Sequence, residues 1–352
     1  MPQDAEFCTL GLQMTNNNGK DFWILSLSGG GYRGLFTATV LAEMQKRIDG
    51  PLADKFDLIA GTSVGSILAA ALAKGVSAIE LPGLFLTHGP DIFNGCWKQL
   101  PVLKAFNLGF FASRYAAKGM KDVLSNDELL GNTCFKDLRR RLLIPTVNLT
   151  KGSAQFFKTQ HCAEYRYDGD IPLIDAVMAS AAAPSYFPVH RFNQSRYADG
   201  GLIANSPAFV AFHEAHYKLK IPIDRIHVIS IGTMNKSVTI DPRSPLSIGL
   251  ITGAGRYFWK GWRQRVFEVT LAAQEQLSED MLSHVNTGRV LRIDVPLEND
   301  QAKVVSLDSV SALANEVLEG QAREATKSLL SGDLYERWKN HSATQPEFFN
   351  QG

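Results

Sequence analysis

The chain has 352 residues, of which 45% are hydrophobic and 20% are charged, and its formal net charge is +1. This length allows one large domain or two ordinary ones with a sizeable core, and the composition excludes a fibrous or disordered chain. A charge so close to zero gives no general attraction to phosphate, so we expect no DNA or RNA polymer as a partner.

The cysteines Cys8, Cys96, Cys134 and Cys162 lie far apart and form no C-x-x-C pair. This spacing argues against a disulfide framework and a zinc knuckle, so we expect no metal, and it suits a reducing cytosol. The acidic start, residues 1–6, is followed by no apolar signal segment, and no apolar run has the pattern of a membrane span. We expect a cytoplasmic protein whose contact with the inner face of a membrane is peripheral.

Residues 1–21 are mostly polar and form a predicted N-terminal extension before a core strand at 22–27. The glycine-rich loop SGGGYRG follows at 28–34, and apolar residues at helical spacing predict a helix over 36–48. Such a loop can cradle a phosphate, supply backbone N–H donors to an oxyanion, or be a flexible turn. No Walker lysine follows it, and a second glycine turn nearby favours the oxyanion role.

Residues 56–73 have the pattern of a short apolar strand, a tight turn and an apolar helix. The turn, Gly61-Thr62-Ser63-Val64-Gly65, matches the G-x-S-x-G elbow that lifts a serine hydroxyl above the end of a sheet. Glycine is expected on both sides of the serine because a Cβ there would clash. An ordinary strand–helix turn can carry the same string, but this context favours Ser63 as a nucleophile at a helix N-terminus.

The middle of the chain begins with a basic and aromatic segment, residues 97–121, that contains no acidic residue. This segment can lie at a membrane interface, cover an apolar pocket, or pack its aromatic rings into the core. Beyond it we predict strands at 142–149 and 154–158 and a helix over 171–183.

The segment Tyr197-Ala198-Asp199-Gly200-Gly201 precedes a predicted helix that begins near Pro207, and a further core strand is predicted at 225–233. An Asp-Gly pair is most often only a turn. The alternation of strands and helices predicts a largely parallel sheet covered on both faces, which is an α/β sandwich in one compact domain.

The C-terminal part has a helical pattern from 246 to 284, a predicted strand at 288–295 and a predicted helix over 308–330. We expect the main domain to span 22–335, including a helical part at about 246–335, and to be followed by a polar tail, 336–352, whose last dozen residues fray.

The stretch RYFWKGWRQR at 256–265 has four basic and four aromatic residues and no acid. Rings beside guanidinium groups suit a nucleotide or a lipid headgroup, although a helix with buried aromatics and solvated charges explains the pattern as well.

Ser63 needs a base, and in an ordinary α/β-hydrolase an acid and then a histidine follow the serine. The histidines after the elbow lie in no obvious catalytic loop, and the pair His213 and His216 lacks a zinc-binding motif. The candidates are His161, His190, His213, His216, His227, His284 and His341.

The three motifs at 29–34, 61–65 and 199–201 occur in the order of the signatures of the patatin-like phospholipases, and the chain resembles that family over about 20–235. The resemblance implies a three-layer α/β/α sandwich and a lipid acyl hydrolase with Ser63 as nucleophile and Asp199 as its sole partner. Ser28 stands where the family usually has Asp, which we expect not to matter. The other residues that the resemblance assigns are Gly29, Gly30, Gly31 and Arg33 in the oxyanion hole and Gly61, Gly65, Gly200 and Gly201 in the elbow and the acid loop.

The run HGPDIF at 88–93, the chain length and the helical C-terminal part are similar to bacterial patatin-like effectors of the CBASS anti-phage systems. That resemblance implies a phospholipase switched on by a cyclic di- or trinucleotide, with no other cofactor, and allows a homo-oligomer. The alternatives are a lipase without nucleotide control and a non-catalytic scaffold that binds lipid or nucleotide. From their chemistry, the candidate nucleotide-binding residues are Arg256, Tyr257, Lys260, Trp262, Arg263 and Arg265.

Overall fold

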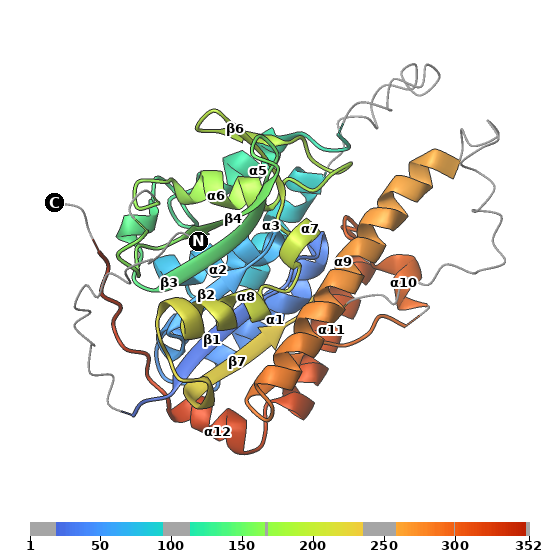
Figure 1. The fold of residues 1–352 in the computed structure, drawn as a ribbon. Helices are drawn as coiled ribbons and strands as arrows, with labels where there is room; N and C mark the ends of the chain where they lie inside the picture. Colours follow the sequence, from blue (N-terminus) through green and yellow to red (C-terminus); the bar gives the residue numbers. More distant parts are fainter. Residues whose placement is uncertain (1–18, 94–112, 166–167, 235–257, 299, 350–352) are drawn as a thin grey trace, which may run out of the picture.

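A mixed sheet of eight strands runs through the centre of the molecule (Figure 1). The computed structural model describes the chain apart from residues 1–18, 94–112, 166–167, 235–257, 299 and 350–352, and it describes only the backbone of 258–266. The strands are β1 Phe22–Leu27, β2 Leu58–Gly61, β3 Arg141–Asn148, β4 Ser153–Lys158, β5 His190–Phe192, β6 Ser195–Asp199, β7 Ile226–Ile231 and β8 Val290–Ile293.

The strand order is β5-β6-β3-β2-β1-β7-β8, with β4 also pairing with β3. Strands β3, β2, β1, β7 and β8 are parallel to one another, whereas β4, β5 and β6 join by antiparallel pairs. The predicted α/β class with a mostly parallel sheet is therefore confirmed. The sequence did not predict the hairpin of β5 and β6.

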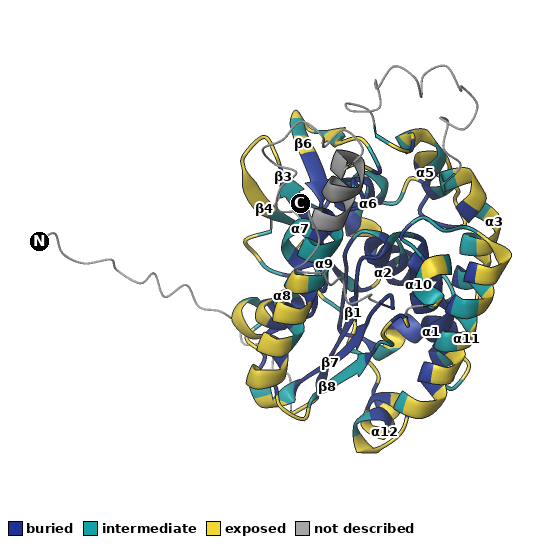
Figure 2. Ribbon diagram, turned by 90° about the vertical axis from the view of Figure 1, so that its right-hand side faces the viewer, coloured by how far each residue is buried: buried dark blue, intermediate teal, exposed yellow. Residues whose placement is uncertain are grey.

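Helices cover both faces of the sheet, and the pleat of β1 shows how the layers form. Trp23, Leu25 and Leu27 pack with residues of α1, α2 and α11, whereas Phe22 and Ile24 pack with residues of α8 and α9. Figure 2 shows α1 and α11 on one side of the strands and α8 and α9 on the other. The longer helices are α1 Gly34–Gln45, α2 Val64–Lys74, α3 Leu81–Phe93, α5 Ala117–Leu124, α6 Leu173–Ser180, α8 Ala208–His213, α9 Phe258–Val285, α11 Ala312–Leu329 and α12 Asp333–Asn340, and the short ones are α7 Gly201–Ala204 and α10 Gln301–Val304.

Strand β3 changes partners along its length, and this change brings β6 toward the elbow. Its first half pairs with β2 as far as Leu143, and its pairing with β6 begins at Thr146, opposite Asp199. Pro145 lies between the part of β3 that pairs with β2 and the part that pairs with β6. On this edge its missing N–H therefore leaves no backbone hydrogen bond of the sheet unmade. Asp199, the last residue of β6, therefore lies next to the end of β2.

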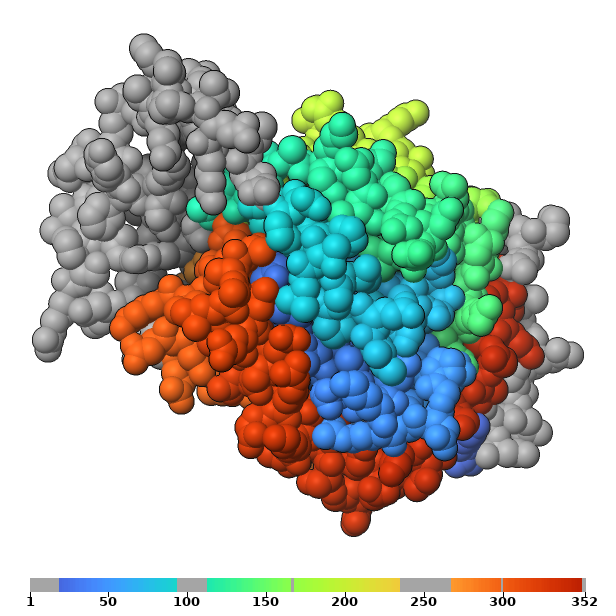
Figure 3. Space-filling model, turned by 180° about the vertical axis from the view of Figure 1, so that it is seen from behind, coloured from blue at the N-terminus to red at the C-terminus, as the bar shows by residue number. Residues whose placement is uncertain are grey.

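The C-terminal segment packs against the sheet layer beyond the predicted boundary at residue 335. Trp338 of α12 is fully buried in the core, and His341 Nε2 lies 2.9 Å from Asp57 Oδ2. The N–H of Thr344 donates to the other oxygen of Asp57 at 3.1 Å, and the N–H of Phe349 bonds to Gln160. The prediction that the last dozen residues fray is wrong for 341–349, because they satisfy a buried carboxylate. Figure 3 shows these red segments against the blue N-terminal part.

Two predicted segments are described only in part. Most of the basic and aromatic segment 97–121 lies outside the described residues; of the rest, Tyr115 is buried and residues from 117 onward begin α5. The helical pattern from 246 gives α9 from Phe258, while 246–257 also lies outside the described residues. Of the helices that the structure describes, none combines the length and the apolar character that a membrane crossing requires.

Candidate active site

The three motifs meet at one edge of the sheet, where the parallel strands end. The glycine loop follows β1, the elbow follows β2, and Thr233 lies just after β7. Asp199 closes β6 at the same edge.

The elbow holds Ser63 in a conformation that residues other than glycine seldom adopt. Its φ of 52° lies in the left-handed region, which costs roughly 1–3 kcal/mol and is common at functional sites. A Cβ on Gly61 would lie 2.1 Å from the Gly65 oxygen, and one on Gly65 would lie 2.2 Å from the Leu27 oxygen. The steric reason for both glycines is therefore confirmed. The N–H of Ser63 donates to Ser180 Oγ at 3.0 Å, which fixes the serine from the side of α6.

Asp199 is a buried carboxylate, only 2% exposed, that forms no ion pair within the described part of the chain. Burial raises its pKa to about 7, although hydrogen bonds from the Gly201 N–H and the Ser63 side chain act in the opposite direction. The Gly201 N–H donates to Oδ1 at 2.6 Å. A carboxyl group with this pKa can accept and return a proton near neutral pH.

The glycine loop is held through its carbonyl groups, and this leaves two backbone N–H groups on its other side. The carbonyl of Gly29 accepts from Thr233 Oγ1 at 3.0 Å, and the carbonyl of Gly30 accepts from Arg33 Nε at 3.4 Å. Because C=O and N–H point in opposite directions across a trans peptide, these bonds direct the N–H groups of Gly30 and Gly31 away from the supporting side chains. Neither N–H meets an acceptor among the residues that the structure describes.

Gly29 and Arg33 lie behind the loop rather than on its open side. The Gly29 N–H donates to the backbone oxygen of Asn205 at 3.0 Å, and Arg33 Nη1 donates to the Met234 oxygen at 3.0 Å. Neither residue is among those that line the adjacent cavity, whereas Gly30 and Gly31 are. The guanidinium of Arg33 thus supports the loop through its carbonyl groups.

A largely apolar cavity opens in front of Ser63 and Asp199. It contains about 990 Å³ of empty space, with part of the open solvent at its mouth included. Residues of α2, α3, α5 and α9 form its walls, and Gly30, Gly31 and Val64 stand beside the serine. The apolar wall residues include Ile67, Leu84, Phe85, Ile92, Phe93, Met120, Leu124, Leu129, Phe267 and Leu271.

Sequence reasoning missed several residues of this site. Val64 follows the serine and begins α2, so its N–H is a third candidate donor, and the residue after an elbow serine often has this role. Thr233 could have been found because it follows a parallel strand at the edge where motifs gather. Asn205, four residues after Gly201, lines the cavity and is 1% exposed.

All eight histidines belong to the described part of the chain, and none lines the cavity. His161, His190, His227 and His341 each lie beside a carboxylate elsewhere in the molecule. A serine–histidine pair therefore has no support from this geometry.

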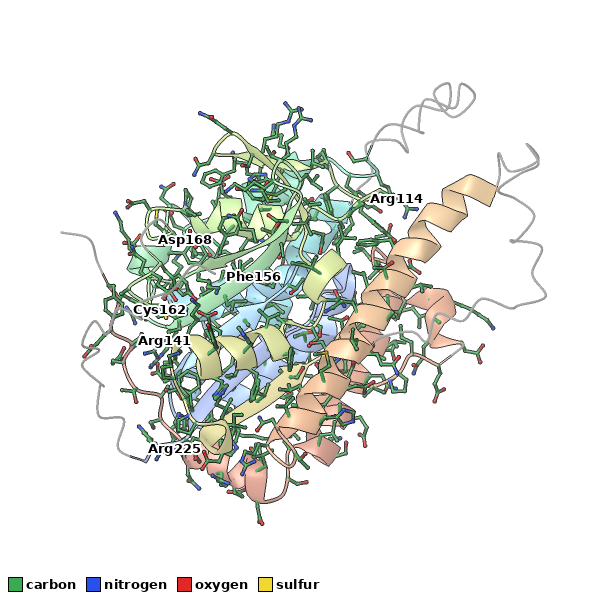
Figure 4. All side chains as sticks on the ribbon, viewed as in Figure 1. Arg114, Arg141, Phe156, Cys162, Asp168 and Arg225 are labelled. Carbon is green, nitrogen blue, oxygen red and sulfur yellow. The ribbon has the colours of Figure 1, made fainter. Side chains whose placement is uncertain are left out.

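One group in the described residues has the composition of a metal site, with ligand atoms of His161, Cys162 and Glu214 within 4.8 Å of one another. Glu214 is already bonded to Lys158 at 2.6 Å and to His161 at 3.1 Å. Burial raises the pKa of the Cys162 thiol to about 11. Cys162 lies on the flank opposite Arg114 (Figure 4), and it is not among the residues that line the cavity. We interpret this group as a buried hydrogen-bond network.

The structure does not place the candidate nucleotide-binding residues. Arg256 and Tyr257 lie outside the described residues, and the other four, Lys260, Trp262, Arg263 and Arg265, lie on the first turns of α9 with undescribed side chains. Phe267 and Leu271, two and six residues after Arg265 on the same helix, line the cavity.

The chain belongs to the patatin-like phospholipases, a family of carboxylic ester hydrolases, because the sequence profile of that family matches residues 25–212. It is 38% identical over 332 residues to a Pseudomonas aeruginosa protein named cGAMP-activated phospholipase, covering 94% of this chain and 95% of the relative. Proteins of the same name from Escherichia coli and Vibrio cholerae are 36% and 34% identical, covering 82% and 89% of this chain and 84% and 94% of those relatives. The family predicted from the three motifs is confirmed.

Proposed function

We propose that Ser63 and Asp199 form the catalytic dyad of a phospholipase that releases fatty acids from membrane phospholipids. The observation that carries this proposal is a buried carboxylate with a pKa of about 7, without a cationic partner among the described residues, beside a strained elbow serine. Both residues face the same apolar cavity, which suits an acyl chain.

In the acylation step, Ser63 Oγ attacks the ester carbonyl while Asp199 accepts the hydroxyl proton. The carbonyl oxygen becomes negatively charged, and the N–H groups of Gly30, Gly31 and Val64 are the candidate donors to it. The ester bond breaks, the lysolipid oxygen takes the proton from Asp199, and the acyl group remains on Ser63.

In the deacylation step, water attacks the acyl carbonyl and Asp199 accepts one of its protons. The bond from the carbonyl carbon to Ser63 Oγ then breaks, and Asp199 returns the proton to the serine. The products are a free fatty acid and the starting enzyme. Asp199 must be ionised at the start of each step. Its pKa of about 7 therefore determines which fraction of the enzyme is active at a given pH.

We further propose that a cyclic dinucleotide activates this enzyme as part of an anti-phage response that damages the cell's own membrane. Support comes from the three relatives named cGAMP-activated phospholipase, which match most of this chain. The basic and aromatic stretch at 256–265 stays our candidate for the nucleotide site. It leads directly into α9, which forms part of the cavity wall through Phe267 and Leu271.

The test is fatty-acid release from phospholipid vesicles by the wild-type chain, Ser63→Ala and Asp199→Ala. Both variants should lose all measurable release, while His161→Ala should keep the activity of its folded fraction. Full activity of Asp199→Ala together with loss in a histidine variant would overturn the dyad.

Cyclic di- and trinucleotides, cGAMP first, should convert a weak basal activity into rapid release in the same assay. Equal rates with and without every nucleotide would instead show an unregulated lipase. A wild-type chain that releases no fatty acid and whose Ser63 is not labelled by a fluorophosphonate would be a non-catalytic scaffold.

A further inference from the structure

Helix α9 runs beside the glycine loop and the acid loop and contacts both. It lies alongside α7 and α8 in Figure 1. Several of its residues lie close to the edge of the sheet that holds Ser63 and Asp199. Gln274 Oε1 accepts a hydrogen bond from the N–H of Asn205, and Ser278 Oγ donates to the Ser206 oxygen at 3.0 Å. The helix is therefore tied to the segment that follows Asp199-Gly200-Gly201.

Glu275 of α9 contacts the residue before the glycine loop and a residue after the acid loop. Its carboxylate is 3% exposed and accepts from Ser28 Oγ at 2.9 Å and from Asn205 Nδ2 at 2.7 Å. Arg292 of β8 neutralises it from the other side, with Nη2 at 2.5 Å from Oε1. A buried charge held by three donors has little freedom to move.

Asn205 contacts both Glu275 and the glycine loop, and so links the two. Its Nδ2 also approaches the Gly29 carbonyl at 3.4 Å, and its backbone oxygen accepts the Gly29 N–H at 3.0 Å. Its Oδ1 would lie 2.5 Å from a Cβ on Gly29 and 3.0 Å from one on Gly201, so the amide fills the space between the two loops. Because Nδ2 of this amide faces Glu275, its Oδ1 faces the two glycines.

We propose that Glu275 is a positioning residue for the oxyanion loop. Through Ser28 and Asn205 it holds the peptide groups on both sides of Gly29, and the Gly29–Gly30 peptide sets the direction of the Gly30 N–H. This role differs from our expectation that the residue at position 28 does not matter. The inference rests on the proposed function, since it assigns Glu275 to the support of the proposed oxyanion donors.

The same geometry gives the proposed activation a physical route. Hydrogen bonds weaken steeply with distance, so a shift of α9 along its axis by about 1 Å would disturb the contacts of Glu275 with Ser28 and Asn205 together. The N-terminal turns of α9 carry the basic and aromatic stretch, while Glu275 lies near the middle of the helix. A ligand that favours one position of α9 would therefore change the oxyanion loop without touching it.

Glu279 provides a matched control because it lies one turn further along α9 and pairs with the same arginine. Its Oε1 is 2.8 Å from Arg292 Nη1, and it accepts from Ser206 and Ser230 rather than from Ser28 or Asn205. Glu279→Gln and Glu275→Gln each remove one negative charge from the same buried network.

The experiment compares kcat and KM of both variants with a soluble p-nitrophenyl ester, alongside their melting temperatures. Complete loss of one oxyanion donor typically costs about 10²–10³ in kcat, so a misplaced donor in Glu275→Gln should cost about 10–100-fold. KM should stay within about twofold, because the loop acts on the transition state. Glu279→Gln should lose less than about threefold in kcat at a similar melting temperature.

Equal kcat losses in the two variants, or a rise in KM that accounts for the loss, would overturn the positioning role. If Glu275→Gln does not fold, Ser28→Ala replaces it, with an expected kcat loss of about threefold to tenfold and an unchanged KM. Unchanged kcat in Ser28→Ala would then contradict the inference. Failure of the proposed function is distinguishable, because in that case Ser63→Ala would match the wild type.

Discussion

Two buried carboxylates in this molecule have pKa values that are shifted in opposite directions. Asp199 at the catalytic edge and Glu214 on the flank near β4 are 2% and 3% exposed. Burial raises the pKa of Asp199 to about 7, whereas the pKa of Glu214 falls to about 2 because hydrogen bonds from His161, Lys158 and Tyr165 outweigh burial. Charge compensation by Lys158, which has no counterpart at Asp199 among the described residues, is a main difference between the two groups.

The comparison explains what makes a buried acid useful as a base. Glu214 has an ammonium group at 2.6 Å and a tyrosine hydroxyl at 2.5 Å, so its charge is permanent and structural. Within the described part of the chain, Asp199 is stabilised only by the Gly201 N–H and the hydroxyl that it is proposed to deprotonate. If the proposed dyad is right, the edge of the sheet that holds Ser63 and Asp199 gives up stability for a carboxyl group that can exchange its proton.

The largest expected effect comes from Asp199→Asn, which removes the uncompensated charge while keeping the shape. Activity on p-nitrophenyl esters should fall by about 10³-fold or more. Stability should move the other way. The folded pKa lies above the unfolded value, so ionising Asp199 costs stability as pH rises from about 4 to 7, at about 1.4 kcal/mol per unit of pKa shift.

Urea titrations at two pH values test this stability effect. Asp199→Asn should be more stable than the wild type at pH 8 by a few kcal/mol, and the two should converge near pH 4. A variant that is less stable than the wild type at pH 8 would show that the Asp199 charge is compensated after all.

Glu214→Gln should have the opposite pair of effects. Removing one partner of a buried, hydrogen-bonded ion pair should destabilise the fold by about 3 kcal/mol at pH 7, because Lys158 keeps its charge. Activity per folded molecule should stay within about twofold of the wild type. The folded pKa lies below the unfolded value, so the stability difference should shrink as pH falls from about 4.5 to 2. A difference that persists at pH 2, or a specific loss of activity, would contradict the structural role.

Thr233→Val should have the smallest effect of these variants. It tests the support of the glycine loop beside Ser63 and Asp199. Thr233 Oγ1 is one of two side-chain donors to the Gly29 carbonyl, so its loss should lower kcat by about threefold to tenfold with KM unchanged. A matched Thr159→Val variant near Glu214 should leave kcat unchanged, since Thr159 bonds to His161 instead. Steady-state kinetics with the soluble ester check both.

The sequence predicted those parts of the site whose role is local. Gly61 and Gly65 are recognisable because a sharp turn excludes a Cβ within the same few residues, and Ser63 follows from their spacing. The alternation of strands and helices was enough to predict the α/β class, and the order of the three motifs indicated the family.

The residues that support the motifs could not be predicted, because their roles depend on contacts between distant segments. Glu275 meets Ser28 across 247 positions of the chain, and an isolated glutamate in a helix gives no sign of this. The polar segment 341–349 has the composition of a fraying end, but it packs because His341 and Thr344 satisfy Asp57. Neither pairing is visible until the chain is folded.

The pH dependence of kcat/KM with a soluble p-nitrophenyl ester tests the central claim most directly. If Asp199 is the base in the free enzyme, the rate should rise tenfold per pH unit below a single midpoint near pH 7 and then level off. Alanine variants of His161 and His190 should show the same midpoint. A midpoint near pH 4, or one that disappears in a histidine variant, would contradict the account.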